Sequence, residues 1–245
     1  METKIRIRLI ALGYPKVVLN LNRVRRWKSN IFSIVHEDAI ELLPDTEGED
    51  WEYSDTQLEG LLPQNNADID ITVGIINAPL EDNYYSRRLH GSRIVVSLYG
   101  ISNVLNSHDI PIENFVLREL YEFIVTFRKF GYVPDVSTHI KHDETRKCLF
   151  DMTPDREDIV HSTNQPYLCD ECTTGLKKAK VSTYFIGMVN KELKRIKKGT
   201  YYKIADFIKR RPILSIIISL TIAFLINLLS SVVFEAFIAT YFRNR

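Results

Sequence analysis

The sequence contains only three cysteines among its 245 residues: Cys148, Cys169 and Cys172. So few cysteines argue against a fold held together by several disulfides. Hydrophobic residues make up 45% of the chain and aromatic residues 11%, which is enough to build a core without such bridges. We therefore interpret the three cysteines as free thiols or metal ligands.

Charged side chains are absent from residues 213–234, which read ILSIIISLTIAFLINLLSSVVF. A helix of these 22 residues would be roughly 33 Å long, enough to cross a hydrocarbon core of about 30 Å. A buried core helix is the alternative, but core helices seldom run this long without a charge. Because only residues 235–245 follow, we expect a tail-anchored protein with one transmembrane helix over residues 212–242.

We also expect no cleavable signal sequence, because METKIRIRLIALG carries charges inside its apolar stretch and has no cleavage site. Basic residues are concentrated before the apolar run, where only Glu192 and Asp206 oppose them, while Arg243 and Arg245 follow it. The basic residues before the run are Lys191, Lys194, Arg195, Lys197, Lys198, Lys203, Lys209, Arg210 and Arg211. This asymmetry predicts a cytoplasmic N-terminal domain on a single-pass membrane protein, in the inner membrane if the cell is bacterial.

The basic segment before the apolar run predicts contact with the lipid bilayer. We interpret residues 181–211 as a basic amphipathic neck helix that attracts anionic headgroups, worth on the order of 1 kcal/mol per basic residue near the surface. The segment leads directly into the apolar run, which argues against nucleic-acid binding. Polar side chains inside the run could form hydrogen bonds between helices, so a homo-oligomer is one possibility and a simple anchor the other. These side chains are Ser215, Ser219, Thr221, Asn227, Ser230 and Ser231.

Apolar periodicity over the N-terminal part predicts an α/β fold. We expect strands at residues 4–12, 31–35, 69–76 and 93–98, helices at 17–29 and 112–130, and a short helix near 57–62. Residues 80–92 are polar and are expected to connect two strands. Residues 1–180 would then form one cytoplasmic domain, which includes a metal-binding segment at 139–172.

Histidine and cysteine cluster within residues 139–172, in HIKHDETRKCLFDM and in CDEC. Cys169 and Cys172 have the C-x2-C spacing that lets two thiolates bind one tetrahedral ion. His142 and Cys148 would complete a Cys3His zinc site, which leaves no open position and is therefore structural. His139 and His161 compete with His142 for the fourth place. Unrelated buried cysteines, or a redox-active C-x2-C pair, are the other interpretations.

The order of these motifs resembles the archaemetzincin branch of zinc metallopeptidases. An opening strand that ends in IALG, a VGII strand and an IVVSL strand precede a core helix, and a histidine, CLFDM and C-x2-C follow it. The resemblance covers about residues 4–175 and implies a zincin-like mixed sheet with core helices and a zinc-stapled C-terminal subdomain. Members of the family carry HExxHxxGxxH for a catalytic zinc, and cysteines that include a C-x2-C for a second, structural zinc.

The sequence departs from the family where the catalytic metal would bind. The core helix reads LRELYEF, so Glu119 keeps the position of the general base while Arg118 and Glu122 replace two histidine ligands. Arginine stays protonated and cannot ligate zinc. The alternative is that Glu119 and Glu122 belong to the solvent face of an amphipathic helix. HEDAI, which begins at His36, does not restore the motif because isoleucine stands in place of its second histidine.

Two classes of function follow. The first is a non-catalytic, membrane-anchored sensor or effector with a structural zinc site, which would bind an unknown protein or small molecule in prokaryotic antiviral defence or stress response. The second is a membrane-tethered zinc metallohydrolase with non-standard ligands drawn from His90, His108, His139 and Glu119, where Glu119 would activate water. No pair among these residues has the i, i+4 spacing of a helical two-histidine site.

Overall fold

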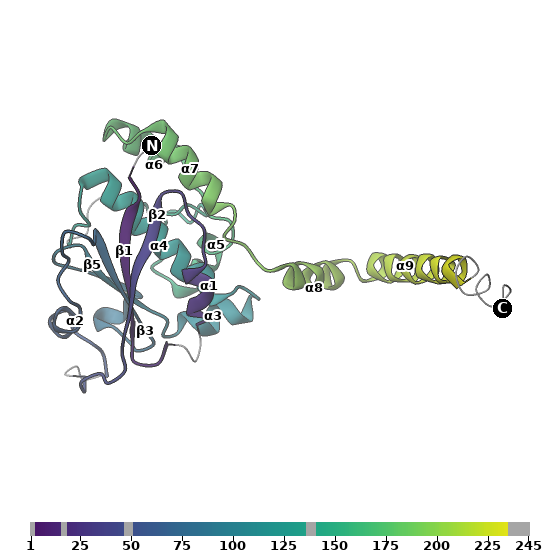
Figure 1. Ribbon diagram of the computed structural model, residues 1–245, viewed down its shortest axis with the longest axis horizontal. Helices are drawn as coiled ribbons and strands as arrows, with labels where there is room; N and C mark the ends of the chain where they lie inside the picture. The colour runs from purple at the N-terminus through teal and green to yellow at the C-terminus, as the bar shows by residue number, and fades with distance from the viewer. Residues whose placement is uncertain (1–2, 16–18, 47–50, 136–140, 235–245) are drawn as a thin grey trace, which may run out of the picture. The chain divides into compact units, whose positions relative to one another are not determined.

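A five-stranded β-sheet forms the framework of the N-terminal part of the chain in the computed structural model (Figure 1). The structure describes residues 3–15, 19–46, 51–135 and 141–234. The strands are β1 (Ile5–Leu12), β2 (Phe32–Ile40), β3 (Ile71–Ile76), β4 (Ser86–Leu89) and β5 (Arg93–Ser97). Their order is β2-β1-β3-β5-β4, with parallel pairing except between β4 and β5, which run antiparallel. The predicted mixed α/β fold is confirmed.

Helices lie between and after the strands. They are α1 (Leu21–Arg25), α2 (Asp55–Leu61), α3 (Ile101–Ser107), α4 (Ile112–Phe130), α5 (Ile159–Ser162), α6 (Asp170–Lys178), α7 (Thr183–Leu193), α8 (Thr200–Arg210) and α9 (Pro212–Val233). The described residues also include the 3₁₀ turns η2 (Glu81–Asn83) and η3 (Arg156–Asp158). Helix α4 has the predicted bounds, whereas β4 lies in a segment that the sequence predicts as a connection.

The sheet is apolar on both faces, because alternate residues of each strand point to opposite sides. Ile7 and Leu9 of β1 join the main core, which also contains the apolar residues of α4. Ile10 and Leu12 join a second core together with Leu58 of α2. The sheet is therefore a central layer with apolar packing on each side.

Helix α4 runs through the main core. It begins after Pro111 and ends at Gly131, whose φ of +80° gives the left-handed turn that commonly terminates helices. Every residue from Ile112 to Thr126 is buried, so no face of this part of the helix reaches solvent. Any charged residue within it must find its partners inside the protein.

The chain divides into two compact units, Met1–Lys198 and Gly199–Arg245. This division corrects the expected neck helix at 181–211, because the structure forms two separate helices there. Helix α7 belongs to the first unit, where Phe185 and Val189 are buried in the main core. Helix α8 begins only after Gly199 and belongs to the second unit.

Glu192 explains why α7 is part of the first unit. Its buried carboxylate accepts hydrogen bonds from Ser29 Oγ (2.6 Å), Tyr121 Oη (2.6 Å) and the backbone N–H of Asn30 (2.7 Å). A buried carboxylate is tolerated only when its oxygens are satisfied in this way. Ser29, Asn30 and Tyr121 are distant from Glu192 in the sequence. The basic residues around Glu192 therefore give no sign that α7 packs against the first unit.

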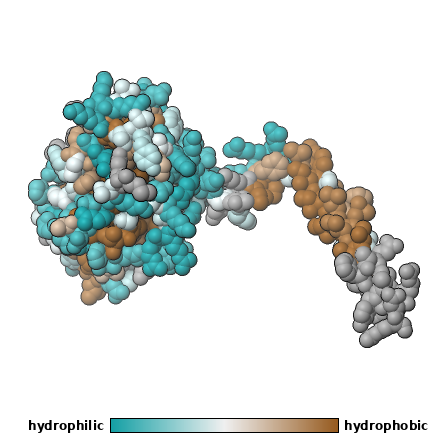
Figure 2. All heavy atoms as spheres, turned by 45° about the horizontal axis from the view of Figure 1, so that its top comes forward, coloured by the Kyte–Doolittle hydropathy of each residue, from teal (hydrophilic) through white to brown (hydrophobic). Residues whose placement is uncertain are grey.

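Helix α9 of the second unit is long and apolar enough to cross a membrane. It begins at Pro212, the position in a first helical turn where proline is best tolerated. None of its residues is buried within the protein, and Figure 2 shows hydrophobic residues along it. Residues 235–242 of the predicted transmembrane helix lie outside the described part of the chain.

Candidate functional site

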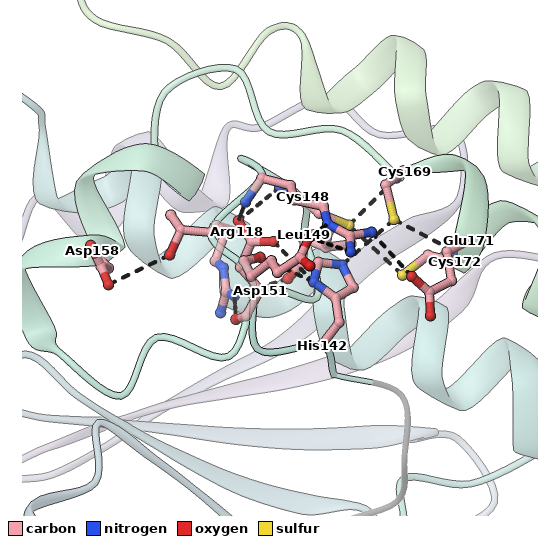
Figure 3. Close-up of polar contacts among 12 residues, drawn as sticks. Arg118, His142, Cys148, Leu149, Asp151, Asp158, Cys169, Glu171 and Cys172 are labelled. Atoms are coloured by element: carbon pink, nitrogen blue, oxygen red, sulfur yellow. Dashed lines mark hydrogen bonds and ion pairs between the residues drawn. The ribbon is translucent and has the colours of Figure 1, made fainter.

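Four potential metal ligands lie together at the start of α6, where Figure 3 shows the three sulfur atoms close to the ring of His142. Cys169 is the N-cap of α6, and Cys172 lies in its first turn. A β-bridge to Tyr167 places Cys148 beside them. The ligand atoms of the four residues all lie within 4.8 Å of one another.

The distances in this cluster fit a tetrahedral zinc ion. Cys148 Sγ lies 3.8 Å from Cys172 Sγ, and His142 Nε2 lies 3.5 Å from Cys169 Sγ. Zinc with Zn–S bonds of about 2.3 Å and Zn–N bonds of about 2.0–2.1 Å separates its ligand atoms by about 3.5–3.8 Å. The cluster could therefore hold zinc, and its four protein ligands would leave no position for a reacting water.

Backbone N–H groups prepare the sulfur atoms for a cation. The N–H of Cys169 donates to Cys148 Sγ (3.4 Å), and the N–H of Cys172 donates to Cys169 Sγ (3.5 Å). A hydrogen bond from the Cys172 thiol lowers the pKa of Cys148 to about 5, against the opposing effect of burial. Since thiolates are the form that binds metal, Cys148 is prepared for this role at neutral pH.

Asp151 supports the cluster, although the sequence analysis did not identify it. Its Oδ2 accepts the backbone N–H groups of Arg146 (3.0 Å) and Cys148 (2.9 Å), and its Oδ1 lies 3.5 Å from His142 Nδ1. Histidine ligands of metals commonly hold their second nitrogen against a carboxylate or carbonyl, which fixes the ring. The signal in the sequence is an aspartate three residues after Cys148, within CLFDM.

His139 and His161 are the alternatives to His142 as the fourth metal ligand. His161 lies in α5 with an exposed side chain and is not part of the cluster. His139 lies outside the described residues. Within the part of the chain that the structure describes, His142 is therefore the histidine that accompanies the three cysteines.

Glu119 and Glu122 of α4 are buried, which corrects the interpretation of these residues as a solvent face. Arg118, Glu119 and Glu122 are each fully buried. Arg118 Nη1 contacts Glu119 Oε1 and lies 2.8 Å from Glu122 Oε2. Arg118 and Glu122 thus form an internal ion pair.

Glu122 also binds two cations from other parts of the chain. Arg88 of β4 and Lys141 each place a nitrogen 3.1 Å from Glu122 Oε1. Burial alone would raise the pKa of Glu122, but the positive charges of Lys141, Arg118 and Arg88 outweigh it and lower the pKa to about 2. Burial raises the pKa of Glu119, against the opposing effect of Arg118. Glu122 is therefore the stable anion of this cluster.

Arg118 connects α4 to the segment that carries the cysteines. Its Nη2 donates to the carbonyl oxygens of Leu149 (2.9 Å) and Asp151 (3.4 Å), as the close-up shows (Figure 3). The guanidinium therefore contacts two carboxylates on its own helix and two backbone carbonyls near Cys148. It links α4 to the segment that carries Cys148.

The candidate ligands of the hydrolase alternative that the structure describes, His90, His108 and Glu119, do not come together. His90 is exposed, with Nδ1 3.7 Å from Asp135 Oδ2, and His108 Nδ1 lies 3.0 Å from the carbonyl oxygen of Val104 in its own helix. Glu119 faces Arg118 instead of either histidine. Among the described residues, the only group of three or more potential ligands is the cluster of His142 with the three cysteines.

No family model matches the sequence, and no curated protein matches it. Two solved structures are similar in fold, and both are archaemetzincins, the family that the sequence motifs resemble. The structure from Archaeoglobus fulgidus, complexed with malonate, has 18% identity and a TM-score of 0.45 over 70% of this chain and 99% of its own. The structure from Methanopyrus kandleri has 16% identity and a TM-score of 0.43 over 72% of this chain and 96% of its own. Similarity at this level assigns no activity and no residue role to the present chain.

Proposed function

We propose that this protein is a non-catalytic, membrane-anchored binding domain that is stapled by a structural zinc ion. The observation that carries the proposal is the ion cluster of Arg118, Glu119 and Glu122. A zinc hydrolase needs about three protein ligands and an open position for water. Here the arginine stands in a fully buried network where such ligands would be required, and the Cys3His cluster has no open position.

The second unit supports a membrane location. In α8, the exposed apolar side chains Tyr201, Ile204 and Ile208 recur at helical spacing, and Lys209 and Arg210 follow in its last turn. A helix with an apolar face and basic residues fits the headgroup region of a bilayer. Helix α9 is the candidate span. We propose that α8 lies in the cytoplasmic interface and α9 crosses the membrane, which places the first unit in the cytoplasm.

Self-association through α9 is a further part of the proposal. The hydroxyl groups of Ser219, Thr221 and Ser231 each donate to a carbonyl four residues earlier in α9. These groups are thus satisfied within one helix, and each oxygen can still accept a bond from a neighbouring helix. A role in antiviral defence or stress response is proposed on the membrane-anchored architecture alone.

Full-length protein loaded with zinc is expected to cleave no peptide, and Glu119→Gln is expected to change nothing in this assay. The physical reason is that the described residues hold no second group of metal ligands, so purified protein should contain one zinc per chain. The measurements are hydrolysis of a mixed peptide library and metal content by mass spectrometry. Two zinc ions per chain, or cleavage that Glu119→Gln abolishes in folded protein, would establish the hydrolase alternative.

Carbonate extraction is expected to leave the full-length protein in the membrane pellet, because α9 lacks any charged side chain to hold it in water. A chain shortened to residues 1–211 should move to the soluble fraction. In sealed inside-out vesicles, which expose the cytoplasmic face, added protease should digest the first unit. Protection of the first unit in these vesicles would show that the proposed orientation is reversed.

A further inference from the structure

A cavity of about 640 Å³ lies beside β4, and the proposed function does not account for it. Arg88 and Lys141 line this cavity, while their shared partner Glu122 is fully buried and is not part of its wall. The other residues of the wall are Asp55, Asp82, Asn83, Tyr84, Tyr85, Ser86, Arg87, Asp135, Met152, Thr153, Pro154 and Arg156. Glu122 therefore lies beneath the cavity wall and forms ion pairs with the two wall cations, Arg88 and Lys141.

The cations behind and along this wall outnumber the carboxylates that they bind. Arg88, Lys141 and Arg118 share Glu122, and Arg118 also contacts Glu119. Three positive side chains thus meet two carboxylates, which leaves one positive charge without a counter-ion in the cluster. Because these side chains are largely removed from water, the surplus charge is weakly screened.

Arg88 and Lys141 have donors to spare. Arginine carries five N–H groups and lysine three, yet each of these residues makes a single carboxylate contact among the described residues, to Glu122 Oε1. Both side chains are partly exposed, 11% for Arg88 and 23% for Lys141. Both side chains line the cavity, and the spare donors are available to a molecule inside it.

Arg156 is another positively charged residue of the wall. Its guanidinium donates to the carbonyl oxygens of Tyr99 (2.9 Å) and Asn83 (2.8 Å), and none of its recorded partners among the described residues is a carboxylate. It packs so closely on Gly100, where φ is +75°, that any side chain at this position would collide with it. The guanidinium of Arg156 is thus held by neutral oxygens of Tyr99 and Asn83.

The acidic residues of the wall are already paired and lie in water. Asp55 binds Arg87 (2.6 Å), Asp82 lies 3.7 Å from the same arginine, and Asp135 lies 3.7 Å from His90. Their side chains are 42%, 72% and 52% exposed, against 11% for Arg88 and 23% for Lys141. Solvent therefore screens these three acids more strongly than it screens Arg88 and Lys141.

We propose that this cavity binds a small soluble anion through a carboxylate or phosphate group that contacts Arg88 and Lys141. Both groups offer oxygen acceptors that suit an arginine and a lysine side by side. The inference rests on the proposed function, since a non-catalytic binding domain requires a ligand site. It names the chemical class of that ligand, and Glu122 acts as a positioning residue for the two cations.

The test uses full-length, zinc-loaded protein in an uncharged detergent, titrated with inorganic phosphate and with succinate at constant ionic strength. We expect one of these anions to raise the melting temperature and to bind measurably in calorimetry. Lys141→Gln and Arg88→Gln should each weaken binding by about tenfold or more, because each removes a charged donor. Lys141→Arg should retain binding, and Lys177→Gln on exposed α6 is the matched control.

Ser86→Trp provides an independent variant, because it fills the cavity and leaves every charge in place. Ser86→Trp should abolish anion binding. If Arg88→Gln and Lys141→Gln lose zinc or fail to melt cooperatively, this variant alone tests whether the anion binds in the cavity. Tighter binding of phosphate or of succinate shows whether the site prefers a phosphate or a carboxylate group. No binding of either anion up to about 10 mM, or equal binding by all variants, would overturn the proposal. Peptide cleavage would instead overturn the proposed function without affecting anion binding.

Discussion

Replacing Cys169 by serine is expected to release zinc and to leave most of the protein insoluble. Cys169 supplies a sulfur to the cluster, caps α6 and lies 3.5 Å from His142 Nε2, so its loss affects three parts of the segment at once. The free energy of metal binding at such sites is folding free energy, on the order of 10 kcal/mol in zinc-finger peptides. That is comparable with the whole stability of an ordinary domain, about 5–15 kcal/mol. Zinc content, soluble yield and melting temperature measure the effect.

Thr174→Ser is the matched control for this experiment, because Thr174 is exposed in the same helix and offers no ligand. It should retain zinc and melt as the unmodified protein does. Removal of zinc from the unmodified protein with a strong chelator should reproduce the Cys169→Ser result. A Cys169→Ser protein with full zinc occupancy would show that the ligand set is wrong.

Arg118→Met is expected to destabilise the first unit by about 3–5 kcal/mol, the range measured when one partner of a buried ion pair is removed. Methionine fills much of the space but leaves Glu119 without its cation and leaves the carbonyl oxygen of Leu149 without a donor. Glu122 keeps Arg88 and Lys141 and so stays charged. Urea unfolding of the zinc-loaded protein, followed by tryptophan fluorescence, measures the change.

Lys177→Met removes a positive charge from exposed α6 and should change the free energy of unfolding by no more than about 0.5 kcal/mol. In the double variant Arg118→Met with Glu119→Gln, the loss should be smaller than the sum of the single losses, because the two residues share one interaction. An Arg118→Met protein as stable as the control would mean that the buried cluster contributes nothing to the fold.

Much of the fold could be predicted because its strands and its central helix carry strong apolar patterns. Helix α4 has the predicted bounds, and β1, β3 and β5 lie where the sequence places them. The two edge strands, β2 and β4, are harder to predict from the sequence. Strand β4 contains Arg87 and Arg88, and β2 continues through His36 and Glu37, because an edge strand keeps polar side chains that read as a connection.

The metal cluster could be found from the sequence because its ligand types and the C-x2-C spacing are visible in it. The buried ion cluster could not. A helix that reads LRELYEF predicts glutamates in solvent, and burying them requires cations from Arg88 and Lys141. Those partners are distant in sequence and carry no periodic signal, so only the fold reveals them.

Helix α7 has a mechanical consequence. It is the last helix of the first unit, so a pull on the proposed membrane anchor would enter the domain at its C-terminal end. The hydrogen bonds of Lys198 and Ile196 would come under tension first. Those of Glu192 would follow, and they join α7 to Ser29 and to Tyr121 of α4. Tyr121 directly precedes Glu122, the carboxylate behind the cavity. Force on the proposed anchor would thus reach α4, the helix whose Glu122 contacts Arg88 and Lys141.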